Sequence, residues 1–196
     1  MPVPATQPTE HSAASTDLQN NQAITRAFIA QAVDFLVHQY LPKIEHCLAE
    51  LNDEQLWWRP NQASNSIGNL VLHLCGNARQ WIIAGLGGAP DTRTRDAEFS
   101  QTEAIPRNEL LAHLRSTVAQ VEGVLNTLDP DILLERRLIQ GVQVNVLKAV
   151  FHVTEHFSMH TGQIVLLTKL LNNKDLGFYD FSTGVPVHHW HRGRKK

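Results

Sequence analysis

The feature that most constrains this chain is the spacing of its apolar residues, which recur every three or four positions over four long stretches. This spacing gathers them on one face of a helix, whereas a half-buried strand would alternate apolar and polar residues. The sequence predicts helices over about 23–51, 66–84, 106–128 and 145–171, with no series of strands. Apolar faces on four helices are buried most simply against one another, so we expect an all-α protein, a four-helix bundle.

Individual residues mark the ends of these helices. Ser66 and Asn145 are of the type that caps helix N-termini, and each stands directly before an apolar repeat. Pro42 falls inside the first stretch, where it removes a backbone donor, so this helix is predicted to be kinked or split. The stretches 52–65 and 89–105 lack a helical repeat and are interpreted as connecting loops.

Composition sets the limits of the folded domain. Residues 1–22 are rich in Pro, Ser, Thr, Gln and Asn and hold too few apolar side chains for a core, so we interpret them as a flexible tail. Residues 173–196 are rich in glycine, aromatic residues and histidine and are interpreted as a second flexible tail. The bundle is therefore predicted over 23–172, and the 42% of apolar residues in this chain of 196 suffices for one core.

Charge and cysteine content exclude several functional classes. The chain holds 17 basic and 19 acidic residues, and four of the basic ones fall in the last five positions, which leaves an acidic body unsuited to binding nucleic acid. No stretch reaches the ~20 apolar residues of a membrane span, and the N-terminal residues do not resemble a signal peptide. Two cysteines are too few for a disulfide framework. We expect a cytoplasmic protein that binds neither nucleic acid nor membrane.

Histidine is the informative residue type, with 11 copies, three of which repeat every fourth position in the last helix. His152, His156 and His160 lie one turn apart on one side of this helix, and two imidazoles at such a spacing can chelate one metal ion. A helical wheel directs His160 almost toward the apolar face, His156 beside it and His152 to its edge. The wheel favours His156 and His160 as the inward pair; the alternative is that these histidines only decorate the helix surface.

The same segment also fits an unrelated signature. His152, Glu155 and His156 match the HxxEH pattern of inverted zinc peptidases, in which the glutamate is the general base. However, the wheel directs Glu155 away from the apolar face, and no later glutamate is available as a third metal ligand. The chain is also short for such an enzyme, so the sequence disfavours a peptidase.

The second helix carries a further histidine in a compact polar strip. His73, Asn77 and Gln80 lie within about 60° of one another on the wheel, on the flank of the apolar face. Position alone leaves His73 open between a hydrogen-bonded core residue and a metal ligand. Gln163 lies on the histidine side of the last helix. The three amides, Asn77, Gln80 and Gln163, can orient metal ligands or contact a substrate, but none can act as a general base.

Two segments, NSIGNLVLHL in the second helix and EHFSMHTGQI in the fourth, resemble the DinB/YfiT-like metalloenzyme family. The resemblance covers most of residues 25–172 and places the two segments in the family's order. In that family, one histidine of the second helix and an HxxxH pair of the fourth bind a divalent metal. The resemblance therefore implies a site formed by His73, His156 and His160, of which the wheel independently favours the last two.

A site of three neutral imidazoles has a definite chemistry. It leaves a divalent ion its full charge and open positions, which is the pattern of catalytic rather than structural zinc sites. Zinc suits this ligand set best, and nickel, iron and cobalt are alternatives. A water or thiol bound there loses its proton more readily and can attack a small electrophile. Some relatives are thiol S-transferases that use bacillithiol or mycothiol, which makes a low-molecular-weight thiol one candidate co-substrate. The GNARQW and HTGQI segments are more similar to an uncharacterised branch of the family, so the resemblance does not fix the substrate.

We therefore expect a metal-dependent transferase or hydrolase that acts on a small molecule, with no general acid or base assigned. One alternative is a metal-binding or stress-response module without turnover, and another is a peptide-binding or dimerising bundle with a vestigial site. A homodimer suits a small bundle, although no residue pattern marks an interface. His188, His189 and His191 near the C-terminus could also bind metal, but a solvated basic tail is favoured.

Overall fold

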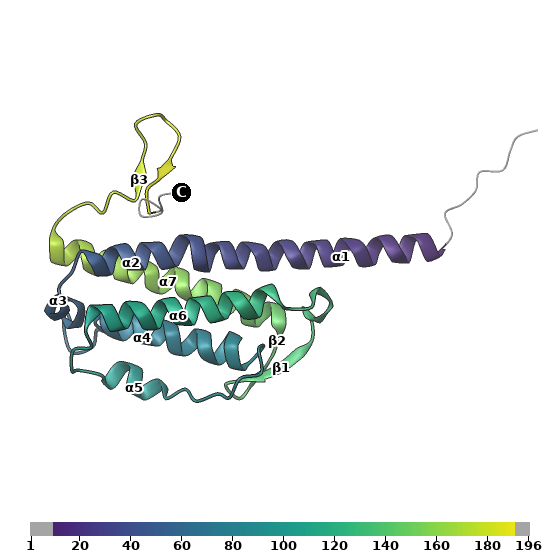
Figure 1. Ribbon diagram of the computed structural model, residues 1–196, viewed down its shortest axis with the longest axis horizontal. Coiled ribbons are helices and arrows are strands. Elements are labelled where there is room, and N and C mark those ends of the chain that lie inside the picture. Colours follow the sequence, from purple (N-terminus) through teal and green to yellow (C-terminus); the bar gives the residue numbers. More distant parts are fainter. Residues whose placement is uncertain (1–9, 191–196) are drawn as a thin grey trace, which may run out of the picture.

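The computed structural model describes the backbone of residues 10–190 and the side chains from residue 18 onward. Four long helical segments lie side by side and form a bundle (Figure 1), which confirms the predicted all-α four-helix architecture. The first segment consists of α1 (Glu10–Val33), the π-helical η1 (Asp34–Tyr40) and α2 (Leu41–Ala49). The other three are α4 (Ile67–Ala78) with the π-helical η2 (Arg79–Ala84), α6 (Arg107–Asn126) and α7 (Val146–Asn172).

The core lies between the four segments, where α4 contacts α6 and α7, and α2 contacts the same two helices. Every segment contributes large, fully buried side chains: Leu36, Ile44, Leu48, Leu74, Ile82, Leu114, Leu125 and Phe157. Burying one such side chain contributes about 1.5–3 kcal/mol, so this cluster is the main source of stability. Because α4 and α7 contact each other along the core, residues on their facing sides are brought together.

The predicted helix ends are confirmed at three positions. Ser66 begins α4 in a capping box, in which its side chain accepts from the Asn69 backbone and the Asn69 side chain accepts from the Ser66 backbone. Asn145 begins α7 by accepting from the Lys148 backbone. Pro42 lies in the first turn of α2, directly after the π-helical η1, so the first helix changes its geometry there.

The N-terminal end differs from the prediction. The sequence predicts a flexible tail over 1–22, but α1 begins at Glu10, so residues 10–22 are helical. This stretch contains neither glycine nor proline and continues directly into the bundle, so nothing in it breaks the helix. Figure 1 shows α1 projecting beyond the other helices, yet neither α1 nor any other described helix is long and apolar enough to span a membrane. Residues 1–9 lie outside the described part of the chain.

The C-terminal end differs as well. In place of a flexible tail over 173–196, the chain folds back and forms a hairpin of β3 (Tyr179–Asp180) and β4 (Val187–His188) beside the first helical segment (Figure 1). The predicted domain boundary at residue 172 is therefore wrong for the part of this region that the structure describes, which ends at residue 190. The basic residues 192–196 and His191 lie outside it.

Aromatic side chains hold this hairpin against the bundle. Three of its apolar residues are buried: Leu176, Phe178 and Trp190. Trp190 Nε1 donates to the backbone oxygen of His38 at 3.1 Å, and the Lys43 ammonium lies 3.9 Å from the centre of a Trp190 ring. This stretch has the composition of a tail, yet it is folded because its aromatic side chains pack against the first helical segment.

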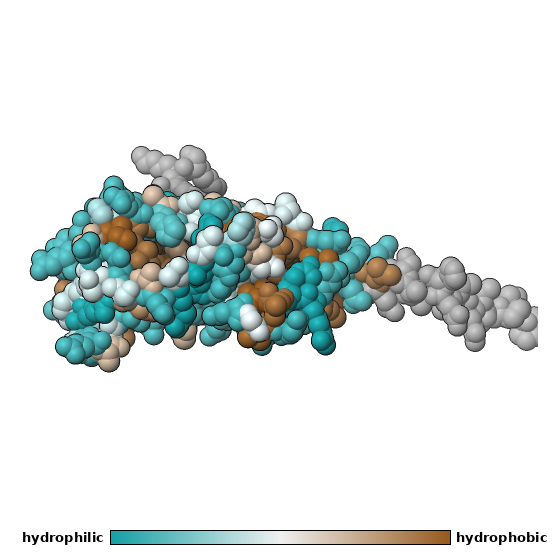
Figure 2. Space-filling model, turned by 90° about the horizontal axis from the view of Figure 1, so that it is seen from below, coloured by the Kyte–Doolittle hydropathy of each residue, from teal (hydrophilic) through white to brown (hydrophobic). Residues whose placement is uncertain are grey.

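The connections between the long helices contain short helices and a β-hairpin. The connection before α4 contains α3 (Asp53–Trp57), and the one after η2 contains α5 (Arg95–Ser100), which contacts α4. The predicted loop over 89–105 is therefore wrong at its centre. Between α6 and α7, the chain forms a hairpin of β1 (Arg136–Ile139) and β2 (Val142–Asn145). Figure 2 shows the face with α5 and this hairpin, on which apolar side chains gather in separate groups.

Candidate metal centre

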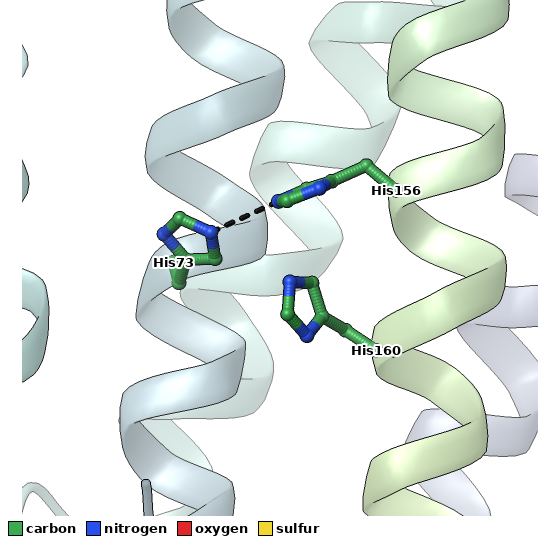
Figure 3. A group of neighbouring side chains, drawn as sticks. All are labelled: His73, His156 and His160. Atoms are coloured by element: carbon green, nitrogen blue, oxygen red, sulfur yellow. Dashed lines mark hydrogen bonds between the residues drawn. The ribbon is translucent and has the colours of Figure 1, made fainter.

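Three imidazole rings meet between α4 and α7 (Figure 3). His73 comes from α4, and His156 and His160 come from successive turns of α7. The ring centroids lie 4.8 Å apart for His73 and His156, 5.1 Å for His73 and His160, and 4.4 Å for His156 and His160. His73 and His160 are only 6% and 8% exposed, and His156 is partly buried. The structure thus brings the three predicted residues together.

Hydrogen bonds at the outer ring nitrogens decide which nitrogen faces the centre. His73 Nδ1 donates to the Glu98 carboxylate at 2.8 Å, and His160 Nδ1 donates to Gln163 Oε1 at 2.6 Å. Both rings therefore present Nε2 as the unprotonated atom. The Nε2 atoms of His73 and His156 lie 2.9 Å apart, so with His73 Nε2 unprotonated the hydrogen bond between them is donated by His156.

This donor set fits a divalent ion. His160 Nε2 is buried without a hydrogen-bond partner. A buried polar atom of this kind is unfavourable unless a ligand binds to it. One ligand nitrogen of each ring lies within 4.8 Å of the others, and imidazole nitrogen is a regular ligand of zinc. Among the described residues, no other group of histidine, cysteine or carboxylate side chains is arranged in this way. The three histidines could therefore hold a metal ion.

A buried ion pair behind His73 holds its ring in place. Arg93 Nε and Nη2 donate to the two Glu98 oxygens at 2.7 and 2.9 Å, and the two side chains are 3% and 9% exposed. Burial alone would raise the pKa of Glu98, but the hydrogen bonds from Arg93 and His73 outweigh it and lower that pKa. Glu98 is thus an ionised acceptor that fixes the tautomer of His73.

A glycine makes room for this carboxylate. A Cβ added to Gly76 on α4 would lie 1.9 Å from Glu98 Oε1, so any larger residue would displace it. The helix α5 carries Glu98 into place and brings Phe99 against His73, with ring centroids 4.6 Å apart. The sequence does not predict Glu98 and Arg93, because they lie in the stretch interpreted as a loop. The opposite charges of Arg93 and Glu98, five positions apart, were a signal for an ion pair in this stretch.

The surroundings keep the imidazoles neutral. Burial, together with the neighbouring charges of His160 and His73, lowers the pKa of His156 to about 3. Burial also lowers the pKa of His160. Neutral imidazole is the form that binds metal. At pH 7 these two rings are already neutral, so an ion does not have to compete with protonation to imidazolium.

The predicted amide residues differ in their relation to the three histidines. Gln163 contacts His160 directly and fixes its ring, as the helical wheel suggests. Gln80 is farther away: its Nε2 donates to Asp91 at 2.8 Å and its Oε1 accepts from Arg93 at 3.0 Å. Gln80 therefore orients Arg93 of the Arg93–Glu98 ion pair and contacts none of the three histidines.

The third amide, Asn77, contacts a histidine outside the group of three. Its Nδ2 lies 3.1 Å from His152 Nε2, and the His152 ring lies against Trp81 with centroids 4.1 Å apart. Asn77 Oδ1 and Trp81 Nε1 are both buried without a partner. Glu155 is exposed, so the HxxEH residues do not assemble a peptidase site. His152 thus lies beside the group of three histidines without joining it.

Comparisons with known proteins agree with this description. A family model described as a protein of unknown function (DUF1572) matches residues 23–184, which include β3 but not β4 of the C-terminal hairpin. No curated protein matches the chain. A conserved protein from Enterococcus faecalis has a similar structure, with a TM-score of 0.61 and 17% sequence identity, over 74% of this chain and 97% of that one.

Two further solved structures are DinB-like proteins. One, YjoA from Bacillus subtilis, gives a TM-score of 0.58 at 16% identity and covers 76% of this chain and 96% of its own. The other, from Bacillus cereus, gives a TM-score of 0.53 at 16% identity and covers 67% of this chain and 85% of its own. At such identities the likeness establishes the fold, which is the DinB/YfiT-like bundle expected from the two sequence segments.

Proposed function

The chain belongs to the DUF1572 family of proteins of unknown function, and from its histidine site we propose that it is a metal-dependent enzyme. His73, His156 and His160 hold a divalent ion through their Nε2 atoms, zinc being preferred over nickel, iron or cobalt. The enzyme transfers a low-molecular-weight thiol, or water, to a small electrophile. The observation that carries the proposal is the buried, unpartnered Nε2 of His160 beside two further imidazoles.

The ligand set supports a catalytic role over a structural one. Structural zinc sites are usually closed by four protein ligands, whereas three leave a position for a substrate. Among the described residues, no cysteine or carboxylate joins the three histidines, so nothing in the ligand set reduces the charge of a bound dication. When bound, such an ion supplies Lewis acidity, which lowers the pKa of a thiol or water in the open position.

The residues around the histidines orient them and keep the site attractive to anions. Glu98 accepts from His73 Nδ1 and increases the basicity of that ring, while Arg93 keeps the carboxylate ionised. Gln163 orients His160 without adding charge. Because Glu98 and Arg93 neutralise each other, the site keeps its attraction for a thiolate.

The proposed transfer is a substitution in which atoms and charges balance. The thiolate sulfur forms a bond to the electrophilic carbon, and the bond from that carbon to its leaving group breaks with its electron pair. The thiol proton passes to water, since no described residue is assigned as a base. Hydrolysis follows the same course with a water oxygen in place of the sulfur.

Metal content of protein purified without a histidine tag tests the first half of the proposal. We expect about one ion per chain by mass spectrometry in the wild type and almost none in His156→Ala. His113→Ala is the matched control, because His113 is an exposed residue of α6 outside the group of three. Metal that persists in His156→Ala but disappears in His188→Ala would place it in the C-terminal hairpin and overturn the proposal.

Thiol transfer by the metal-loaded chain tests the second half. The chain is mixed with cysteine and monochlorobimane, whose fluorescence rises when sulfur replaces chloride. We expect a rate above that of His156→Ala at equal protein concentration. A chain that binds one ion yet catalyses neither this transfer nor hydrolysis of ester, amide and epoxide probes would favour the alternative, a metal-binding or stress-response module without turnover.

A further inference from the structure

A cavity lies along the same pair of helices as the three histidines. It has a volume of about 310 Å³ and is partly open to solvent, and its lining includes Pro60, Ala63, Leu70, Gln163, Leu166 and Leu167. Pockets for small molecules begin at about 300 Å³, so this one has room for a small ligand or one part of a larger one. Because it lies at the seam between α4 and α7, we call it the seam pocket.

The seam pocket continues the line of the histidines. Leu70 precedes His73 by three residues on α4, and Gln163 follows His160 by three residues on α7, so each lies one turn along the same helix face. Gln163 belongs to both places, because its Oε1 accepts from His160 Nδ1 at 2.6 Å while its side chain lines the pocket. Gln163 is therefore the residue that links the pocket lining to the His160 ring.

The lining of the seam pocket is uncharged. Among the described residues, it consists of apolar side chains, amides and one hydroxyl, with no acid, base or histidine. A charged group placed there would lose hydration without gaining an opposite charge. The cavity of about 330 Å³ beside α5 differs in this respect, because Arg79, Arg93 and Glu98 line it. The two cavities thus suit ligands of different charge.

Gln163 adds one directional feature to this apolar lining. Its Oε1 is occupied by His160, and within the described part of the chain its Nε2 has no hydrogen-bond partner. The free N–H groups favour a ligand atom that accepts a hydrogen bond, such as a carbonyl oxygen. Gln163 is exposed and lines the pocket, so this donor is available to a ligand bound there.

We propose that the seam pocket binds the uncharged, apolar part of the electrophile, whose acceptor atom receives a hydrogen bond from Gln163 Nε2. This inference rests on the proposed function and specifies its substrate class: small neutral molecules with an alkyl or aryl part and an acceptor next to the reacting carbon. A carboxylate or phosphate on the apolar part weakens binding, because the lining offers such a group no opposite charge.

Binding of two matched probes to the metal-free chain tests the inference without any catalysis. The probes are 2-octanone and octanoate, which have the same chain length but differ in charge. Leucine methyl resonances report where each probe binds. We expect 2-octanone to shift the methyl signals of Leu70 and Leu167, and to bind at least about tenfold more tightly than octanoate.

A pair of glutamate variants on α7 provides the matched control. Leu166→Glu places a charge at the pocket, and we expect it to weaken 2-octanone binding by about tenfold or more. Leu170→Glu places the same charge one turn along α7, where the leucine does not line the pocket, and we expect no change. Both leucines are exposed, 58% and 64%, so neither substitution disturbs the core.

Three results would overturn the inference: octanoate binding as tightly as 2-octanone, equal weakening by the two glutamate variants, or methyl shifts confined to leucines outside the pocket. A chain that binds metal but no ketone would also overturn it while leaving the proposed function intact. A chain that binds the ketone as expected but takes up no metal would support the pocket and overturn the proposed function instead.

Discussion

Replacing Glu98 by glutamine tests whether the buried ion pair governs metal binding through His73. The substitution keeps the side-chain size and an oxygen that can accept from His73 Nδ1, but it removes the negative charge. Loss of such a partner behind a metal-binding histidine costs about 10–100-fold in metal affinity. This corresponds to about 1.4–2.7 kcal/mol, and we expect the Kd for zinc to rise by that factor in a titration against a chromophoric chelator.

The same substitution also affects the stability of the fold. The Arg93 side chain is 3% exposed, and without Glu98 its charge is buried unpaired. Breaking a buried pair costs about 3–5 kcal/mol. Gln80 Oε1 still accepts from Arg93 Nη1 at 3.0 Å, so we expect the lower end of this range in urea denaturation. Zinc affinity must therefore be measured where circular dichroism shows a folded chain.

Two further variants separate the two effects. A double variant, Arg93→Met with Glu98→Leu, replaces the pair by apolar groups and is expected to recover stability but not zinc affinity, because leucine offers His73 Nδ1 no acceptor. Asp96→Asn removes an exposed charge from the same short helix and is expected to change neither. Wild-type zinc affinity in Glu98→Gln or in the double variant would refute a role for this ion pair in metal binding.

Local geometry elsewhere in the chain gives further expected outcomes. Gly76→Ala displaces the Glu98 carboxylate and is expected to weaken zinc binding by about tenfold or more in the same chelator titration, and an unchanged affinity would contradict this. In Gly123→Ala, by contrast, the added methyl meets open space on α6 and is expected to stabilise the chain by about 0.5–1 kcal/mol in thermal denaturation. Burial raises the pKa of Cys75 to about 12, so this thiol should resist a disulfide reagent until urea unfolds the chain, and rapid labelling of the folded chain would contradict its burial. The pKa of His156 falls from 6.5 to about 3 on folding, so the unfolded chain binds this proton more tightly. Unfolding midpoints of the metal-free chain should therefore decrease as the pH falls below about 6.5, and a flat profile would contradict the assignment.

The three candidate metal ligands could be predicted to different extents because their burial has different causes. His156 and His160 are four residues apart on one helix, and a helix is rigid enough for spacing alone to place them on one face. His73 lies only on the flank of the apolar face of its own helix, and it is buried by Phe99 and Glu98 from α5. A helical wheel of α4 alone cannot show a contact with α5. The resemblance to a known family was therefore needed to identify His73 as a candidate ligand.

The ends of the chain were harder to predict for a related reason. The C-terminal hairpin depends on contacts such as that between Trp190 and His38, which lie 152 positions apart, and no local pattern reveals a partner so distant. The beginning of α1 was misplaced because polar composition was taken as disorder, although a polar stretch without glycine or proline can extend an existing helix.

The distribution of the three histidines over α4 and α7 has a consequence for folding. The Nε2 atoms of His73 and His156 lie 2.9 Å apart, although the two residues are 83 positions apart in the sequence. An ion shared by these helices would close the intervening chain, including α5, α6 and the β1–β2 hairpin, into one loop. In the chain-entropy model, a covalent link around a loop of this length is worth roughly 4.5 kcal/mol. Metal supply would then set how much of the protein survives heat or proteolysis, whatever reaction the centre catalyses.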